Sequence, residues 1–416
     1  MPVKPPRFTF APHPAMLARK IWEEPQPMKK DALAGIRVVD FTTTIAGPHC
    51  TRLLADLGAE VVKIEAPEGD MMRTRPPVRN GASGVYGYLN AGKKSLVLDL
   101  KKPSAVATAR RLAARADIVV ENFRPGVMRR LGLDYESLKA LKPDLIYCAI
   151  SGYGQTGPSA ELPAYAPMIH AASGYEMAHL TYQPGRERPD NCGVFFADFN
   201  SGAYAFGAIM TALYQRQATG IGQMIDVSMC ETMLGVLMGE VVRAQVPFDL
   251  PSRPMFGPVR TKDGYVMPAV ASERTFQGLC RAAGHPEWIE DPRFARYADR
   301  RNNWGAYVDE LERWSSQLSS DEVMAKFEAN GVPASRYRTV AELMHDPQLA
   351  HRGALQPVTD AGGTVNVMAP PFRLSEAETR VRPFCESLGE HAEDVLRNWG
   401  FGADEVAKLK SDGALG

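Results

Sequence analysis

The chain has 416 residues, of which 45% are hydrophobic and 23% are charged, a composition typical of globular proteins. Its 48 Lys and Arg residues equal its 48 Asp and Glu residues, so no net charge attracts the chain to a nucleic acid or an anionic membrane. The length exceeds what one hydrophobic core usually supports and therefore predicts two domains.

Cysteine usage and the first residues indicate the compartment. The six cysteines are scattered, with no CxxC pair and no Cys/His cluster at metal-ligand spacing, which favours reduced thiols in a cytoplasmic protein without a bound metal. No apolar run reaches about 18 residues, so we expect no membrane span. Residues 1–30 are Pro-rich and lack the apolar core of a signal peptide, and we interpret them as an N-terminal extension.

Beyond this extension, short apolar runs alternate with segments of helical periodicity. Strands are predicted for 36–41, 60–65, 95–100, 117–123 and 144–151. Strands that alternate with helices predict a parallel sheet with both faces covered, whose ligands bind at the carboxyl ends of the strands. The expected fold class is therefore α/β, with this sheet forming a large domain over residues 31–225.

The pattern changes after the large domain. A strand and then a long apolar helix are predicted for 224–245, and the Pro-rich stretch 247–258 predicts a crossing into another domain. We assign residues 226–345 to a linker helix and a small α+β domain. Residues 346–416 are expected to return to the large domain.

The glycine-rich turn GYGQTG at 152–157 matches the dinucleotide fingerprint G-x-G-x-x-G. The fingerprint needs a helix directly after it, but prolines at 158, 163 and 167 disfavour one. The first predicted strand-helix unit, where the fingerprint belongs, has only Gly47 in its turn. A nicotinamide nucleotide site is therefore disfavoured.

Basic and polar side chains follow several predicted strands. The basic ones are Lys101, Lys102, Arg124, Arg129 and Arg130. Such residues at strand ends suit a phosphorylated ligand, although each single charge also fits a solvated helix start. Asn122 and Phe123 directly follow a strand and are placed to hydrogen-bond and stack on a ligand base. The helix start GPHC at 47–50 offers free N–H groups to an anion or is an ordinary helix start.

The stretch FFADFNSG at 195–202 places a single carboxylate between phenylalanines and small residues. A helix is predicted over 201–217, with Tyr204 on its apolar face. Asp198 is either a cap of this helix or a nucleophile, because a helix N-terminus stabilises negative charge. On the second interpretation, Gly202 leaves room for an approaching substrate.

A family resemblance rests on several long motifs in a fixed order. They are GIRVVDFTTTIAGPHCTRLLADLGAEVVKIEAPEGD, NAGKKSLVLDLKKP, ADIVVENFRPGVMRRLGLDYESL, YCAISGYGQTGP, TGIGQMIDVSMCE and the ending SLGEHAEDVLRNWG. Together they resemble the family III CoA-transferases over roughly residues 35–400. The resemblance implies a Rossmann-like large domain, a smaller α+β domain and two chains interlocked as a homodimer.

The resemblance also implies roles for individual residues. The family's catalytic aspartate lies in a GD-x-x-x-G turn, which corresponds to ADFNSG here, so the implied nucleophile is Asp198. The implied CoA contacts are Ala46, Leu98 to Lys101, Asn122, Phe123, Arg124 and Arg130.

Departures from the family pattern bear on the substrate. Racemases of the family carry a His-Asp pair where this chain has Tyr165 and Ala166, so racemisation is disfavoured. Formyl-CoA transferase has a glutamine at the position of Ile45 and a glutamate at that of Ala166, so formate and oxalate are disfavoured. Ile45, Tyr165 and Ala166 are assigned to a more apolar or roomier substrate pocket, which suggests a larger acyl group. His170 and Glu176 are interpreted as ordinary helix or loop residues rather than replacements.

The activity that the resemblance implies is acyl-CoA:carboxylate CoA transfer. CoA moves from a donor acyl-CoA to a free carboxylic acid through aspartyl anhydride and aspartyl-CoA thioester intermediates. CoA is a co-substrate, and no ATP, metal or redox cofactor is expected. An acyl-CoA racemase or epimerase and a non-catalytic CoA-binding protein are the alternatives. The sequence does not specify the donor and acceptor acids.

Overall fold

A computed structural model describes residues 30–183, 185–246 and 256–416. Its largest sheet has six strands in the order β5–β2–β1–β6–β7–β8, and all neighbouring strands run parallel. The strands are β1 (Arg37–Asp40), β2 (Glu60–Glu65), β5 (Lys94–Val97), β6 (Ile118–Glu121), β7 (Ile146–Ser151) and β8 (Gln223–Ser228). The predicted parallel sheet of an α/β fold is therefore confirmed.

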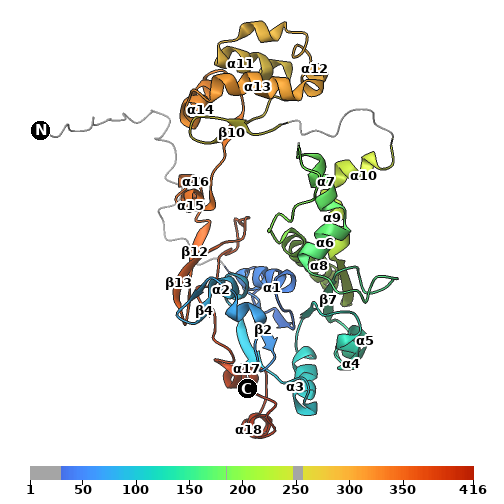
Figure 1. Ribbon diagram of the computed structural model, residues 1–416. Coiled ribbons are helices and arrows are strands. Elements are labelled where there is room, and N and C mark those ends of the chain that lie inside the picture. The colour runs from blue at the N-terminus through green and yellow to red at the C-terminus, as the bar shows by residue number, and fades with distance from the viewer. Residues whose placement is uncertain (1–29, 184, 247–255) are drawn as a thin grey trace, which may run out of the picture.

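Both faces of this sheet are covered by a hydrophobic cluster. Successive side chains of a strand point to opposite faces, so neighbouring residues belong to different clusters. In β1, Val38 belongs to one hydrophobic cluster and its neighbour Val39 to the other. The cluster of Val38 includes residues of α1 (Ala46–Asp56) and α8 (Phe196–Thr219). The cluster of Val39 includes residues of α3 (Pro103–Ala113), α17 (Ala392–Asn398) and α18 (Ala403–Ser411). The C-terminal helices thus cover the same face as α3 (Figure 1).

The strand order reverses between β1 and β6. From β1 the chain builds outward through β2 to β5, and it then returns to the other side of β1 as β6. Loops that leave the carboxyl ends of two such strands diverge and leave a crevice, the usual ligand site of open α/β sheets. Here the two loops are joined by Asn122, whose side-chain amide accepts from the Thr43 N–H and donates to the Thr43 carbonyl, both at 2.9 Å.

A second region has a hydrophobic core of its own. It contains the three-stranded sheet β11–β10–β9 and the helices packed on it. The elements are β9 (Val259–Arg260), β10 (Tyr265–Pro268), α11 (Glu273–Ala283), η3 (Pro286–Ile289), α12 (Tyr297–Asn302), α13 (Trp304–Ser315), α14 (Ser320–Ala329) and β11 (Ala334–Arg336). In Figure 1 this region lies at the top, apart from the large sheet.

The remaining elements are short and connect these two regions or border the sheet. They are η2 (Met71–Thr74), β3 (Val78–Arg79), β4 (Ala82–Ser83), α2 (Gly84–Asn90), α4 (Val127–Arg130), α5 (Tyr135–Lys139), α6 (Ala166–Ala172), α7 (Tyr175–Thr181), α15 (Val340–Leu343), α16 (Pro347–His351) and the antiparallel pair β12 (Leu355–Asp360) and β13 (Gly363–Met368).

Two helix predictions were wrong. Helix α8 begins at Phe196 rather than at 201, so Asp198 lies inside its first turn, and Tyr204 is 57% exposed rather than part of the buried stripe. The single long helix expected after β8 is two helices, α9 (Met229–Val236) and α10 (Met238–Arg243), which meet at Leu237. The predicted extension up to residue 29 and most of the predicted crossing, 247–255, lie outside the described residues.

Candidate active site

A cavity of about 960 Å³, part of it open to solvent, lies at the carboxyl ends of β1, β6, β7 and β8. Asp198 lines it, together with loop residues that follow each of these strands. The lining includes Thr43, Thr44, Ala46, Asn122, Phe123, Arg124, Ser151, Gly152, Tyr165 and Met229. The cavity therefore lies where the strand order predicts a ligand-binding crevice.

A second cavity of about 800 Å³ adjoins the first at the ends of β1, β2 and β5. Thr43 and Phe123 line both cavities, so the two form one continuous edge of the sheet. Leu98, Asp99, Leu100 and Lys101 line the second cavity, whereas Ala46, Asn122 and Arg124 line the first. Arg130, at the end of α4, is exposed and lines neither.

Asp198 is an unusual carboxylate because it is buried and has no cationic partner among residues 30–183, 185–246 and 256–416. Its side chain belongs to the third residue of α8 and is 8% exposed. Burial raises the pKa of Asp198 to about 7, and a hydrogen bond from the backbone N–H of Ala46 acts in the opposite direction. Ala46 is the first residue of α1, so the carboxylate faces the N-terminus of a second helix as well as lying in the first turn of its own.

The crossing of α1 and α8 depends on Gly202. A Cβ added at Gly202 would lie 2.6 Å from the carbonyl oxygen of Ala46 and 2.9 Å from Cδ2 of His49. The glycine therefore lets the two helix backbones approach closely enough for Asp198 to meet the Ala46 N–H. The space expected at Gly202 for a substrate is filled by α1.

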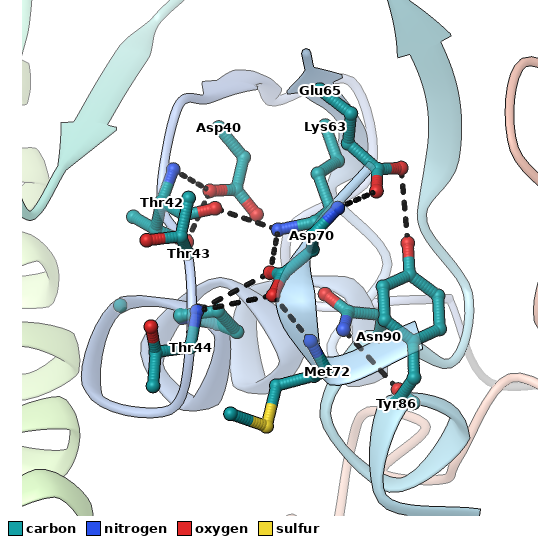
Figure 2. A network of polar contacts seen from close by, with 12 residues as sticks. Asp40, Thr42, Thr43, Thr44, Lys63, Glu65, Asp70, Met72, Tyr86 and Asn90 are labelled. Atoms are coloured by element: carbon teal, nitrogen blue, oxygen red, sulfur yellow. Dashed lines mark hydrogen bonds and ion pairs between the residues drawn. The ribbon is translucent and has the colours of Figure 1, made fainter. Parts of the chain in front are cut away.

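The loop between β1 and α1 is held by buried ion pairs (Figure 2). Lys63 bonds the Thr42 carbonyl at 2.6 Å and pairs with Asp70 at 3.1 Å, and the Asp70 carboxylate accepts from the Thr44 N–H. Thr44 has a φ of 70°, which is costly for a β-branched residue and persists only where its surroundings enforce it. The ion pair thus fixes the loop that presents Ala46 to Asp198.

A second ion pair anchors the start of the same loop. Asp40, the last residue of β1, accepts from the Thr42 N–H at 2.8 Å and from Lys93 at 3.1 Å. Burial acts to raise the pKa of Asp40, but the charges of Lys93 and Lys63 together with hydrogen bonds from the Thr42 and Thr51 side chains hold the pKa below its ordinary value. Asp40 therefore stays charged and is a scaffold group, since it lines neither cavity.

His170 holds the start of helix α8. Its Nε2 accepts a hydrogen bond from the Ala197 N–H at 3.1 Å, and its side chain is 1% exposed. Burial lowers the pKa of His170, so the ring is neutral and able to accept. The interpretation of His170 as an ordinary helix residue missed this contact, which a sequence does not reveal because 27 residues separate the two groups.

Replacing His170 tests whether this contact positions Asp198. If Asp198 is the nucleophile that the resemblance implies, His170→Ala should lower kcat for the implied CoA transfer about tenfold, because the buried Ala197 N–H loses its acceptor beside Asp198. CoA affinity should stay within about twofold. His170→Gln, which offers a carbonyl oxygen, should recover most of kcat. Steady-state kinetics and calorimetric CoA titration distinguish these outcomes, and equal kcat values in the two variants would contradict the positioning role.

The three residues assigned to the substrate pocket have different locations. Tyr165 lines the Asp198 cavity and is 58% exposed. Ile45 packs with Met72 and other residues in a core cluster, and Ala166 is buried against the sheet, so neither is among the lining residues. Glu176 lies on α7 and also does not line the cavity.

Three residues that line the cavity were not predicted from the sequence, namely Ser151, Thr43 and Thr44. Ser151 is the last residue of β7, and its buried hydroxyl has no hydrogen-bond partner within the described residues. Its place at the carboxyl end of a predicted strand was the available signal. Within the same residues, no group of three or more His, Cys, Asp or Glu side chains is arranged to hold a metal ion.

The geometry places a buried aspartate with a raised pKa in a cavity at the carboxyl ends of the strands, and comparisons with known proteins identify the class. Residues 33–392 match the family described as CoA-transferase family III. The chain is 34% identical over 391 residues to succinate–glutarate CoA-transferase of Agrobacterium fabrum, covering 89% of this chain and 96% of that one. It is 37% identical over 396 residues to acetyl-CoA:oxalate CoA-transferase of Acetobacter aceti, covering 92% and 99%.

A solved structure of a related protein has the same fold. The chain superposes on a CAIB/BAIF family protein from Brucella suis with a TM-score of 0.79 and 34% identity, covering 89% of this chain and 100% of that one. The chain is a CoA-transferase and belongs to CoA-transferase family III. None of the helices in the described ranges combines the length and apolar character that a membrane crossing requires.

Proposed function

We propose that the protein transfers CoA from an acyl-CoA to a free carboxylic acid with Asp198 as the covalent nucleophile. The observation that carries this proposal is the burial of Asp198 in the cavity lining, facing a helix N-terminus and no cationic partner among the described residues. A pKa of about 7 leaves a large share of the group ionised at neutral pH. A carboxylate stripped of water and of ion pairs is a stronger nucleophile than a solvated one.

The proposed reaction exchanges activated acyl groups at one site. The Asp198 carboxylate attacks the donor thioester, the C–S bond breaks, and a mixed anhydride and the CoA thiolate form. The thiolate then attacks the aspartyl carbonyl, which releases the donor acid and leaves an aspartyl-CoA thioester. The acceptor carboxylate attacks this thioester to give a second anhydride and free thiolate. Attack of the thiolate on the acceptor's acyl carbon completes the product and restores Asp198.

The tetrahedral intermediates of these steps carry a negative oxygen beside Asp198. The N–H groups at the start of α1, at Ala46 and Gly47, are the proposed donors to it. The Gly202 N–H is not proposed as a donor, because it lies inside the first two turns of α8 and belongs to the backbone hydrogen-bond ladder of that helix.

CoA is proposed to lie along the continuous edge formed by the two cavities. Leu98 and Lys101 line one part of this edge, and Ala46, Asn122, Phe123 and Arg124 line the other. Lys101 and Arg124 would pair with phosphates, and Phe123 would stack on the base. Arg130, at the end of α4, remains a proposed CoA contact although it lines neither cavity. No cofactor besides the co-substrate CoA is proposed.

A homodimer in the cytoplasm is the proposed form of the enzyme. Large apolar side chains are exposed on α8 to α10, where a second copy would cover them. They include Tyr204, Tyr214, Leu234, Met238 and Val242, with exposed fractions from 44% to 77%. The interlocked arrangement remains part of this proposal. Light scattering during gel filtration should give the mass of two chains, and the mass of one chain would contradict it.

Trapping the covalent intermediates tests the mechanism. Borohydride or hydroxylamine should inactivate the enzyme only when acyl-CoA is present, because only the aspartyl thioester or anhydride reacts. Peptide mass spectrometry should then locate the modification on Asp198. A matching assay follows exchange of a labelled donor acid into its own acyl-CoA with no acceptor present. The absence of both exchange and adduct at saturating acyl-CoA would refute the covalent route.

The alternatives receive less support from the same cavity. A racemase needs two groups that remove and return a proton, and the described residues that line the cavity include no histidine and no carboxylate besides Asp198. In a protein that only binds CoA, a buried and unpaired carboxylate such as Asp198 would lower the stability of the fold without contributing to a reaction. Incubation of a 2-methylacyl-CoA in deuterium oxide separates the racemase from the transferase, since only racemisation exchanges the α-proton.

A further inference from the structure

The side of the Asp198 cavity that lies away from the proposed CoA contacts is apolar. The CoA contacts follow β5, β1 and β6, whereas β7 and β8 lie beyond β6 in the sheet. Most side chains that line the cavity at and after β7 and β8 are apolar. They are Ile150, Gly152, Ala160, Leu162, Ala164, Tyr165 and Met229, and the polar groups among them are the Ser151 hydroxyl, the Tyr165 phenol and Asp198 itself.

The rim of this side exposes large apolar side chains. Leu162 is 52% exposed and Tyr165 is 58% exposed, and Met71, which also lines the cavity, is 61% exposed. Apolar groups that gather at the mouth of a cavity instead of packing inside indicate contact with an apolar ligand. The buried hydroxyl of Ser151 has no hydrogen-bond partner within the described residues and is available as a donor in the cavity that Asp198 also lines.

The charges of the lining separate two classes of acid. Among the described residues that line the cavity, the only cationic side chain is Arg124, which is exposed and stands on the loop after β6 with the proposed CoA contacts. A second carboxylate on the β7–β8 side would be stripped of water without a cation to pair with, and this is costly. A methyl group there loses no hydration and gains apolar contact.

We propose that the transferred acyl group belongs to an apolar monocarboxylic acid longer than acetate, with its hydrocarbon on the β7–β8 side of the cavity. The inference rests on the proposed CoA transfer at Asp198. It sets this chain apart from its relatives named for succinate–glutarate and for oxalate, which are dicarboxylates.

A matched pair of acids tests the proposal on the wild-type enzyme. Hexanoate and adipate have the same number of carbons and differ only in a terminal methyl group against a carboxylate. With acetyl-CoA as donor, hexanoate should have at least about a tenfold higher kcat/KM. Between butyrate and hexanoate, kcat/KM should rise about fourfold per methylene. A preference for adipate, glutarate or succinate would overturn the substrate class and leave CoA transfer intact, whereas no transfer to any acid would overturn both.

A pair of surface variants links the preference to this wall. Leu162→Arg places a cation at the rim and should lower the hexanoate-to-adipate ratio of kcat/KM about tenfold. Leu141→Arg is its control, because Leu141 is 50% exposed and lies outside the cavity. Both side chains are half in solvent, so both variants should fold. Identical acid preferences in the two variants would contradict the proposed location of the acyl group.

Discussion

Asp198→Asn is expected to abolish CoA transfer and, at the same time, to stabilise the folded protein at about pH 8. Loss of the nucleophile should lower kcat by ~10³-fold or more. The amide keeps an oxygen that accepts from the Ala46 N–H but carries no charge, so the helix crossing is preserved. CoA binding should remain within about threefold of wild type, as measured by calorimetry.

The stability gain follows from the direction of the pKa shift. Burial raises the pKa of Asp198 from 3.8 to about 7, so the folded chain holds a proton that the unfolded chain has released between these values. The wild-type protein therefore loses stability as pH rises through this window, by on the order of 4 kcal/mol at 1.36 kcal/mol per pH unit. Asp198→Asn removes this loss.

Denaturant unfolding at several pH values checks the prediction. The variant and wild type should be about equally stable near pH 4, and the variant should gain steadily until about pH 7 and level off above it. The same titration should appear in catalysis as an acid limb in kcat/KM of the wild type with an apparent pKa of about 7. A stability difference that does not change with pH would mean that Asp198 is not buried as a high-pKa acid.

Gly202→Ala should damage both stability and catalysis, although it adds a single methyl group. The new Cβ would lie 2.6 Å from the Ala46 carbonyl oxygen, a backbone atom that moves only if α1 moves. Overpacking of this kind costs about 1–3 kcal/mol. The helices would separate at the point where Ala46 donates to Asp198, and a displacement of about 1 Å there should lower kcat about 100-fold.

The matched control lies on the same helix. A Cβ at Gly207 would meet no atom within 4 Å, so Gly207→Ala should keep full activity and raise helix stability by up to about 1 kcal/mol. The melting temperature should therefore rise in Gly207→Ala and fall in Gly202→Ala, and kcat should fall only in Gly202→Ala. If Gly202→Ala melts and turns over like Gly207→Ala, the close approach of α1 and α8 is not required for the site.

Much of the fold is readable from local patterns. Each strand of the large sheet is a short apolar run bounded by turn residues, and strands separated by helices leave a parallel sheet as the expected arrangement. The motifs also indicate the family, and the strand ends indicate where a ligand binds. The start of α8 was misplaced because Asp198, Asn200 and Ser201 all resemble helix caps, while the actual first residue, Phe196, carries no capping signal.

The sequence by itself determined the alternation of strands and helices and the family, because these depend on residue type and spacing, and through the family resemblance it indicated Asp198 as the expected nucleophile. Only the tertiary structure decided what surrounds that aspartate. The Ala46 N–H, the Gly202 crossing, the His170 contact and the apolar β7–β8 wall each join segments far apart in the chain. Burial and hydrogen-bond partners are properties of such long-range packing, so the raised pKa that makes Asp198 a candidate nucleophile does not exist until the chain has folded.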